Sequence, residues 1–209
     1  MKKILLLLLL IPCSVFALAD NAKSSILIDF NTGKVLHENR ADERMPMASM
    51  TKMMTMLILM EAVDSGQIKL NDDIVISHNA SSMGGSQAYL EENTKMKLDV
   101  LLKAVAIASA NDAAVAIAEA IAGSTDEFVK LMNKRAKELK LTNTNFVNVH
   151  GLDHSDHYSS ARDMANLARE LVKHDKILLF SSIYEDYIEH PNGQSTWIVN
   201  TNKIVYKFL

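Results

Sequence analysis

The sequence predicts an α+β domain behind an export signal, and two patterns carry this prediction. Apolar residues recur every three or four positions in several long segments, which indicates helices with one buried face. Apolar alternation on both sides of Asn31-Thr32-Gly33 indicates a β-hairpin. The chain has 209 residues, 48% of them hydrophobic, which is enough for one domain with a sizeable core. Its net charge of −3 does not suggest a nucleic-acid partner.

The first 19 residues have the pattern of a secretory signal peptide. Two lysines precede the apolar run Ile4–Ile11, and Ala17-Leu18-Ala19 is typical of a cleavage site. We therefore expect a secreted protein whose mature domain occupies residues 20–209. The single cysteine, Cys13, lies inside the signal, so the mature chain has no disulfide, thiol nucleophile or thiolate metal site.

The expected elements follow in order along the chain. The hairpin covers 25–37, and a helix begins at Ser49 and ends near Ser65-Gly66. The apolar stripe predicted for this helix is Met53, Met56, Leu57 and Met60. The further expected elements are a strand at Ile74–Ile76, a loop at Ser81–Ser86, helices near 98–108, 112–122, 124–140 and 160–172, a loop at Asn143–Asp156, and strands at Trp197–Val199 and Lys203–Val205.

Ser49-Met50-Thr51-Lys52 is the first motif with a chemical meaning. On a helix, Ser49 and Lys52 share a face because they are three residues apart. The helix N-terminus favours the alkoxide that a nucleophilic serine must become. A lysine whose pKa is lowered by burial or by nearby cations accepts the serine proton. The plainer alternative is a serine cap followed by a solvated lysine, which is the commoner meaning of a lone S-x-x-K.

Ser109-Ala110-Asn111 is the second motif, and it lies in a break between two apolar helices. Taken alone, it indicates that Asn111 caps the following helix. A serine–lysine pair, however, needs a second hydroxyl to relay a proton to the leaving amine. It also needs an amide to orient the lysine and the substrate, so Ser109 and Asn111 complete a candidate site.

Together, the two motifs resemble those of the serine D-alanyl-D-alanine carboxypeptidases, the low-molecular-mass penicillin-binding proteins. The resemblance runs from about Lys23 to the end of the chain. It implies the α+β fold of serine β-lactamases and DD-peptidases, with a helical cluster packed on an antiparallel sheet that is incomplete in this chain. Other segments similar to the family, in the family's order, are Gly84-Gly85-Ser86, Phe146-Val147-Asn148, His150-Gly151-Leu152 and His157-Tyr158-Ser159-Ser160-Ala161-Arg162-Asp163.

The resemblance implies a role for each residue of the two motifs. Ser49 is expected to be the acylated nucleophile, and its backbone N–H half of the oxyanion hole. Lys52 is expected to be the general base and Ser109 the proton relay, while Asn111 orients Lys52 and the substrate.

The resemblance also implies the setting in which the protein acts. The expected substrate is the peptidoglycan stem peptide, with β-lactams as covalent inhibitors, in the periplasm or cell envelope beyond the bacterial inner membrane. No metal or cofactor is implied. His150, His154 and His157 lie in one polar loop, and we do not expect them to bind zinc.

The third family motif, Lys-Thr-Gly, is absent from the 209 residues. This motif supplies the lysine that holds the substrate carboxylate, and its strand supplies the other half of the oxyanion hole. We therefore expect impaired activity and an incomplete sheet in the chain as it stands. Association with a membrane is expected only if an anchor lies beyond residue 209.

Two other functions stay open. The segment from Glu138 to Asn143 loosely resembles the glutamate region of class A β-lactamases, which hold a hydrolytic water there. Fast nitrocefin hydrolysis would favour this function. The other possibility is a non-catalytic remnant that binds cell-wall peptides, which the absence of Lys-Thr-Gly favours.

Overall fold

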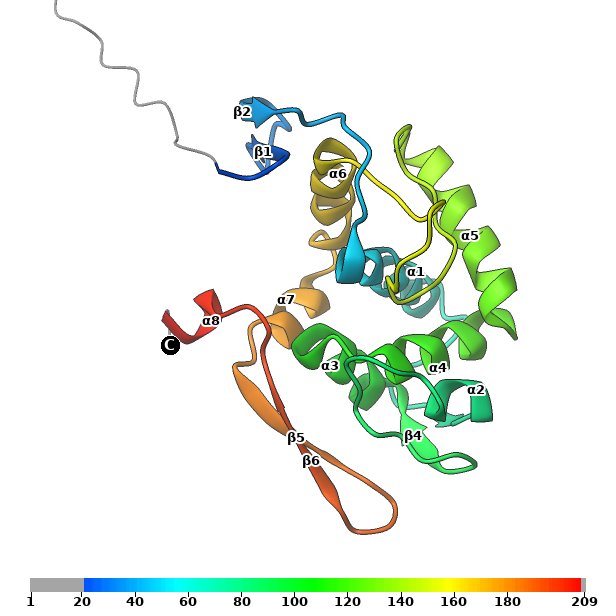
Figure 1. The fold of residues 1–209 in the computed structure, drawn as a ribbon. Helices are drawn as coiled ribbons and strands as arrows, with labels where there is room; N and C mark the ends of the chain where they lie inside the picture. Colours follow the sequence, from blue (N-terminus) through cyan, green and yellow to red (C-terminus); the bar gives the residue numbers. More distant parts are fainter. Residues whose placement is uncertain (1–20, 208–209) are drawn as a thin grey trace, which may run out of the picture.

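A computed structural model describes residues 21–207 (Figure 1). The predicted signal peptide, residues 1–19, lies outside the described residues. In the part that is described, the helices are too short or too polar to cross a membrane. The elements in chain order are β1 (Ser25–Ile28), β2 (Val35–Asn39), the 3-10 turn η1 (Ala48–Thr51), α1 (Lys52–Asp64), β3 (Asp73–Val75), α2 (His78–Ser81), β4 (Lys95–Lys97), α3 (Leu98–Ala108), α4 (Asn111–Ala122), α5 (Thr125–Glu138), α6 (Ala161–Leu171), α7 (Asp175–Ser181), β5 (Glu185–Glu189), β6 (Ser195–Val199) and α8 (Ile204–Lys207).

Helix α1 is the centre of the fold, because α4, α5 and α6 all pack against it (Figure 1). The predicted single apolar stripe is therefore wrong in part. Leu57 is completely buried as predicted, but Met53 and Met56 are only partly buried, whereas Met54 is completely buried on another side. A helix surrounded by other helices is apolar nearly all round, so periodicity does not define one face.

The predicted helices are confirmed with small shifts at their ends, and serine side chains cap two of them. Ser124 Oγ accepts a hydrogen bond from the Glu127 N–H at the start of α5, and Ser160 Oγ accepts one from the Asp163 N–H at the start of α6. Each bond satisfies a backbone donor that the first turn of a helix leaves free.

The C-terminal part differs most from the prediction. The strand expected at Lys203–Val205 is wrong, because α8 covers Ile204–Lys207. Asn202 Oδ1 accepts a hydrogen bond from the Ile204 N–H, and this local bond favours a helical turn over an extended segment. Four further elements, α2, β4, α7 and β5, are not predicted from the sequence, because they are too short or too polar for a clear periodic pattern.

The strands of the described residues form three separate two-stranded antiparallel sheets, β1–β2, β3–β4 and β5–β6. The predicted 25–37 hairpin is thus confirmed as β1–β2, with Leu27 opposite His37. The hairpin lies against α6, where Arg169 Nε donates to the Phe30 carbonyl at 2.9 Å. Leu27 and Leu36 remain exposed on it.

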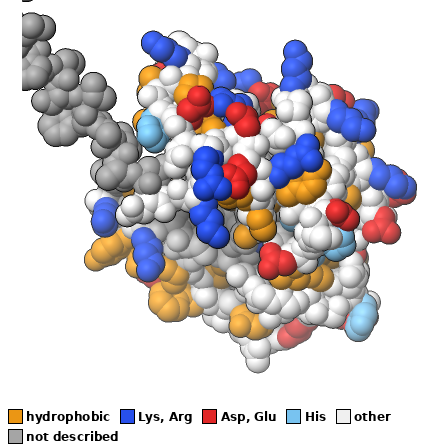
Figure 2. All heavy atoms as spheres, turned by 45° about the horizontal axis from the view of Figure 1, so that its top comes forward, with side chains coloured by type: hydrophobic (Ala, Val, Ile, Leu, Met, Phe, Trp, Pro, Cys, Tyr) orange, Lys and Arg blue, Asp and Glu red, His pale blue; other side chains and the backbone are white. Residues whose placement is uncertain are grey.

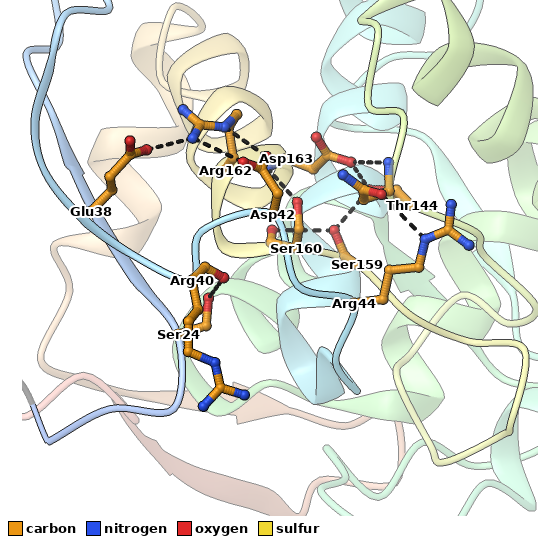
Figure 3. Close-up of polar contacts among 11 residues, drawn as sticks. Ser24, Glu38, Arg40, Asp42, Arg44, Thr144, Ser159, Ser160, Arg162 and Asp163 are labelled. Atoms are coloured by element: carbon orange, nitrogen blue, oxygen red, sulfur yellow. Dashed lines mark hydrogen bonds and ion pairs between the residues drawn. The ribbon is translucent and has the colours of Figure 1, made fainter.

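Two residues at the start of α6, Arg162 and Asp163, hold other segments of the chain, as Figure 3 shows. Arg162 pairs with Glu38 and, at 2.7 Å, with Asp42 in the segment that leads to η1. The buried Asp163 carboxylate accepts hydrogen bonds from the Asn143 N–H and, at 2.8 Å, from the Thr144 hydroxyl. The start of α6 therefore anchors both the approach to Ser49 and the loop after α5.

The surface on this side carries mixed charges. Figure 2 shows Lys and Arg side chains lying among Asp and Glu side chains. Exposed ion pairs such as Arg40 with Glu43 and Lys130 with Glu127 belong to a surface of this kind, and each contributes little to stability.

Candidate active site

The predicted nucleophile lies in the short turn that leads into α1. Ser49 is an exposed residue of η1, and the α-helix begins at Lys52 rather than at Ser49. Ala48, the residue before Ser49, has a left-handed backbone with φ of +46°. Because this conformation is uncommon for a residue with a side chain, the surroundings of the turn must hold it in place.

Lys52 is buried directly beside the serine. Its Nζ donates to Ser49 Oγ at 3.2 Å and to the His150 carbonyl at 2.6 Å. The prediction that the Ser49 and Lys52 side chains lie on the same face is thus confirmed. Burial lowers the pKa of Lys52 from 10.5 to about 8, since a charged amine is poorly solvated there. The amine therefore lies much closer to neutrality than a surface lysine, without help from a second cation.

The second motif is placed near the first but does not bond to it. Within residues 21–207, the Ser109 hydroxyl makes no hydrogen bond, and Ser109 itself ends α3 with a φ of +58°. Asn111 lies inside the first turn of α4, whose N-cap is Ala110, so the helix-cap alternative is wrong. Its side-chain amide donates instead to the Gly84 carbonyl at 2.7 Å.

Two glycines allow the loops to close over the motif residues. A Cβ on Gly151 would lie 2.0 Å from the Ala48 carbonyl oxygen, and a Cβ on Gly85 would lie 2.7 Å from Asn111 Nδ2. The contact with the Ala48 backbone excludes a side chain at Gly151, whereas a side chain at Gly85 would have to displace the Asn111 amide. Both glycines also have positive φ. The Gly85 position would also approach Leu152 Cδ2 at 3.9 Å, so the loops around Gly85 and Gly151 link the two motifs.

A buried carboxylate next to the second motif holds one of these loops. Asp112 is completely buried and accepts hydrogen bonds from the N–H groups of Ala88, Leu90 and Ala113. The neighbouring Asn111 N–H donates to Ser86 O at 2.7 Å. No sequence pattern predicts this role for Asp112, because its partners at Ala88 and Leu90 come from a distant segment that reaches it only in the folded chain.

His150 and His157 of the polar loop, and Glu138 of the β-lactamase alternative, all contact other groups of the protein. His150 supplies its carbonyl to Lys52, and burial, followed by the charge of Lys52, lowers the pKa of its side chain to about 4. His157 bonds to Thr51 and Val147. Glu138 is exposed on α5 and pairs with Arg135 at 3.2 Å. Among the described residues, no three His, Cys, Asp or Glu side chains gather as a metal site would need.

Comparison with known proteins gives one family. The model of the Peptidase_S11 family, D-alanyl-D-alanine carboxypeptidase, matches residues 14–208. The D-alanyl-D-alanine carboxypeptidase DacF of Bacillus subtilis is 53% identical over 188 residues, which are 90% of this chain and 48% of DacF. DacA of Escherichia coli is 42% identical over 159 residues, 73% of this chain and 40% of DacA. The chain thus spans about half the length of these curated relatives.

Solved structures give the same result. Penicillin binding protein 5 from Haemophilus influenzae has a TM-score of 0.83 at 33% identity, covering 90% of this chain and 54% of that chain. The D-alanyl-D-alanine carboxypeptidase DacD from Francisella tularensis has a TM-score of 0.81 at 33% identity, covering 84% of this chain and 43% of that chain. The predicted α+β fold is confirmed, and the chain belongs to the D-alanyl-D-alanine carboxypeptidase family of serine DD-peptidases.

Proposed function

We propose that this protein is a serine-type D-alanyl-D-alanine carboxypeptidase that forms an acyl-enzyme on Ser49. The observation that carries the proposal is the buried Lys52 amine, with a pKa of about 8, at 3.2 Å from Ser49 Oγ. An amine of lowered pKa within hydrogen-bond reach of a hydroxyl is the arrangement that activates a serine nucleophile. The names of the relatives support the same reaction.

The reaction divides into two steps. Neutral Lys52 takes the Ser49 hydroxyl proton while Oγ attacks the carbonyl between the two terminal D-alanines of a peptidoglycan pentapeptide. The Ser49 N–H donates to the oxyanion of the tetrahedral intermediate. When that intermediate collapses, the C–N bond breaks and D-Ala leaves after its amine receives the proton. Water then hydrolyses the Ser49 ester and releases the tetrapeptide.

Ser109 and Asn111 have supporting roles in this proposal. Ser109 relays the proton to the leaving amine, and its hydroxyl is free of hydrogen bonds within residues 21–207. Asn111 orients the substrate from the start of α4, where the contact with Gly84 O holds its amide; the expected contact with Lys52 is not present among the described residues. No residue is assigned to the substrate carboxylate, because Lys-Thr-Gly is absent from the 209 residues.

The proposal extends to the setting of the enzyme. A signal peptide at residues 1–19 exports the protein to the cell envelope, where its substrate lies. β-Lactams acylate Ser49 and leave a slowly hydrolysed ester.

The test measures D-Ala released from a diacetyl-Lys-D-Ala-D-Ala peptide. Residues 20–209 are assayed alone and joined to the part of DacF that they do not match, because the chain spans 48% of DacF. The joined protein is expected to release D-Ala, and its Ser49→Ala variant is not. Equal release by both would overturn the proposal. Peptide binding without release would favour the non-catalytic alternative.

Nitrocefin separates the peptidase from the β-lactamase alternative. A long-lived acyl-enzyme is expected, and Glu138→Gln should leave its lifetime unchanged because Glu138 lies in a surface ion pair. Fast nitrocefin turnover that Glu138→Gln abolishes would favour a β-lactamase instead.

A further inference from the structure

A short chain of hydrogen bonds runs from the loop after α5 to the residue before Ser49. The Val147 N–H donates to His157 Nδ1 at 3.0 Å. His157 Nε2 lies 2.6 Å from Thr51 Oγ1, and Thr51 Oγ1 donates to the Ala48 carbonyl at 2.8 Å. His157 and Thr51 are both buried, so water does not compete for these bonds.

The end groups fix the direction of every bond in this chain. A backbone N–H can only donate, so His157 Nδ1 must accept from Val147 and carries no proton. A neutral imidazole then holds its proton on Nε2, which donates to Thr51 Oγ1. The Ala48 carbonyl can only accept, so it takes the Thr51 hydroxyl proton. His157, Thr51 and Ala48 therefore form one ordered unit that exists only with neutral His157.

The environment of His157 keeps the ring neutral. Burial lowers its pKa below 6.5, the neighbouring His154 acts in the same direction, and Asp153 opposes them. The Phe146 ring packs edge-on at 6.1 Å between centroids. On protonation, an N–H on Nδ1 would face the Val147 N–H, donor against donor.

The unit ends on the backbone turn that presents the nucleophile. Ala48 has its uncommon φ of +46°, and its carbonyl is confined between the Thr51 hydroxyl and the backbone of Gly151. The next atoms along the chain are the Ser49 N–H and then the Ser49 side chain. A rotation of the Ala48 peptide would therefore move both groups relative to Lys52.

We propose that His157 is a positioning residue for the nucleophile, acting through Thr51 to hold the Ala48 turn that sets Ser49 against Lys52. The inference rests on the proposed acyl-enzyme function. His157 does not touch the reacting atoms, and its effect is on geometry alone. Small displacements of reacting groups have large kinetic effects, so the loss of this unit should be visible in the acylation rate.

The kinetic test follows acylation by a fluorescent penicillin in residues 20–209 joined to the part of DacF that they do not match. Thr51→Val removes the hydroxyl and keeps the shape, and Thr51→Ser is the matched control that keeps it. Thr51→Val and His157→Phe should each slow acylation by roughly ten- to a hundredfold, with the affinity of the initial non-covalent complex unchanged. Thr51→Ser should remain near the wild-type rate, and His157→Gln, whose amide can still donate to Thr51, should recover part of the loss. The double variant should be no slower than the slower single one, because both changes remove the same support.

A spectroscopic test stands apart from activity. Nitrogen-15 spectra of His157 should show a pyridine-like Nδ1 and a protonated Nε2, and the Ser49 amide resonance should move in Thr51→Val but not in Thr51→Ser. If the wild type is acylated and Thr51→Val is acylated equally fast, the inference about His157 is wrong, and the proposed function still stands. A protonated Nδ1 at neutral pH would also overturn it, even if a variant fails to fold. If the joined protein is not acylated at all, the acyl-enzyme proposal fails, and the spectra alone decide the role of His157.

Discussion

At the scale of single residues, the proposed reaction depends on one buried amine. Lys52 has no carboxylate partner among the described residues, and its Nζ donates only to Ser49 Oγ and the His150 carbonyl. A charged amine held in this way is destabilised relative to the neutral form. The same burial that brings the Lys52 amine closer to neutrality therefore costs folding stability at neutral pH.

This cost predicts a pH dependence of stability. The pKa of Lys52 is about 8 in the folded protein and 10.5 as its ordinary value, so between these pH values the unfolded chain binds more protons. The free energy of unfolding should therefore rise with pH across this window, by about 3 kcal/mol in all. Urea denaturation at pH 8, 9 and 10 should show the rise in the wild type and in Lys134→Met, an exposed lysine of α5. Lys52→Met should lack it, and an equal rise in Lys52→Met would contradict the depressed pKa.

Lys52→Arg tests the amine as a base. A guanidinium keeps its proton, so this variant should be nearly inactive in acylation although its charge is preserved. The measurement is the rate of labelling by a fluorescent penicillin. Labelling within about tenfold of the wild type, or roughly 1.4 kcal/mol of barrier, would show that Lys52 is not the base.

At the scale of elements, loops that are distant in sequence complete the site. The His150 carbonyl meets Lys52 across 98 residues, and Gly151 lies against the Ala48 carbonyl. Spacing within one helix predicts the Ser49–Lys52 contact, because both residues lie on one local structure. It does not predict contacts between segments, so the roles of His150 O and Asp112 become clear only from the structure. Short elements such as α7 and β5 are missed for a related reason, since their positions depend on packing more than on local pattern.

Substitution of two glycines distinguishes how much stability is lost to close packing and how much to backbone conformation. Gly151 and Gly66 both have positive φ, but a Cβ on Gly66 would meet nothing within 4 Å. Gly66→Ala should cost about 1–2 kcal/mol of stability from the left-handed backbone alone. Gly151→Ala should cost roughly 3 kcal/mol or more and should also abolish penicillin labelling, because it displaces the Ala48 turn. Urea denaturation and labelling check both variants, and equal losses would mean that the Gly151 contact is not tight.

The whole molecule is a helical core with small sheets at its edges. The residues of α1 and α4 are largely buried, whereas β1 and β2 contain no buried residue. The hairpin is held by side-chain contacts to α6, such as Arg169 with Phe30 O and Arg162 with Glu38. The motifs Ser49–Lys52 and Ser109–Asn111 indicate the α+β fold class, because they lie where the helices meet. They contain no information about the strands, so the division into three separate sheets could not be predicted from them.

The unequal burial predicts unequal local stability. Hydrogen exchange followed by mass spectrometry should find the amides of α1 and α4 most protected and those of β1–β2 exchanging first. The reason is that opening the hairpin exposes little apolar surface, while opening α1 exposes the core. Protection of the hairpin equal to that of α1 would contradict this view.

The central claim is that Ser49 is the acylated nucleophile, and mapping the adduct tests it most directly. Residues 20–209 joined to the part of DacF that they do not match are treated with penicillin, digested, and analysed by mass spectrometry, with Ser49→Ala as the test variant. Ser195→Ala, an exposed serine on β6, is the matched control. One penicilloyl group on the peptide containing Ser49, lost in Ser49→Ala and kept in Ser195→Ala, is the predicted result. An adduct on another residue, or undiminished labelling of Ser49→Ala, would contradict the account.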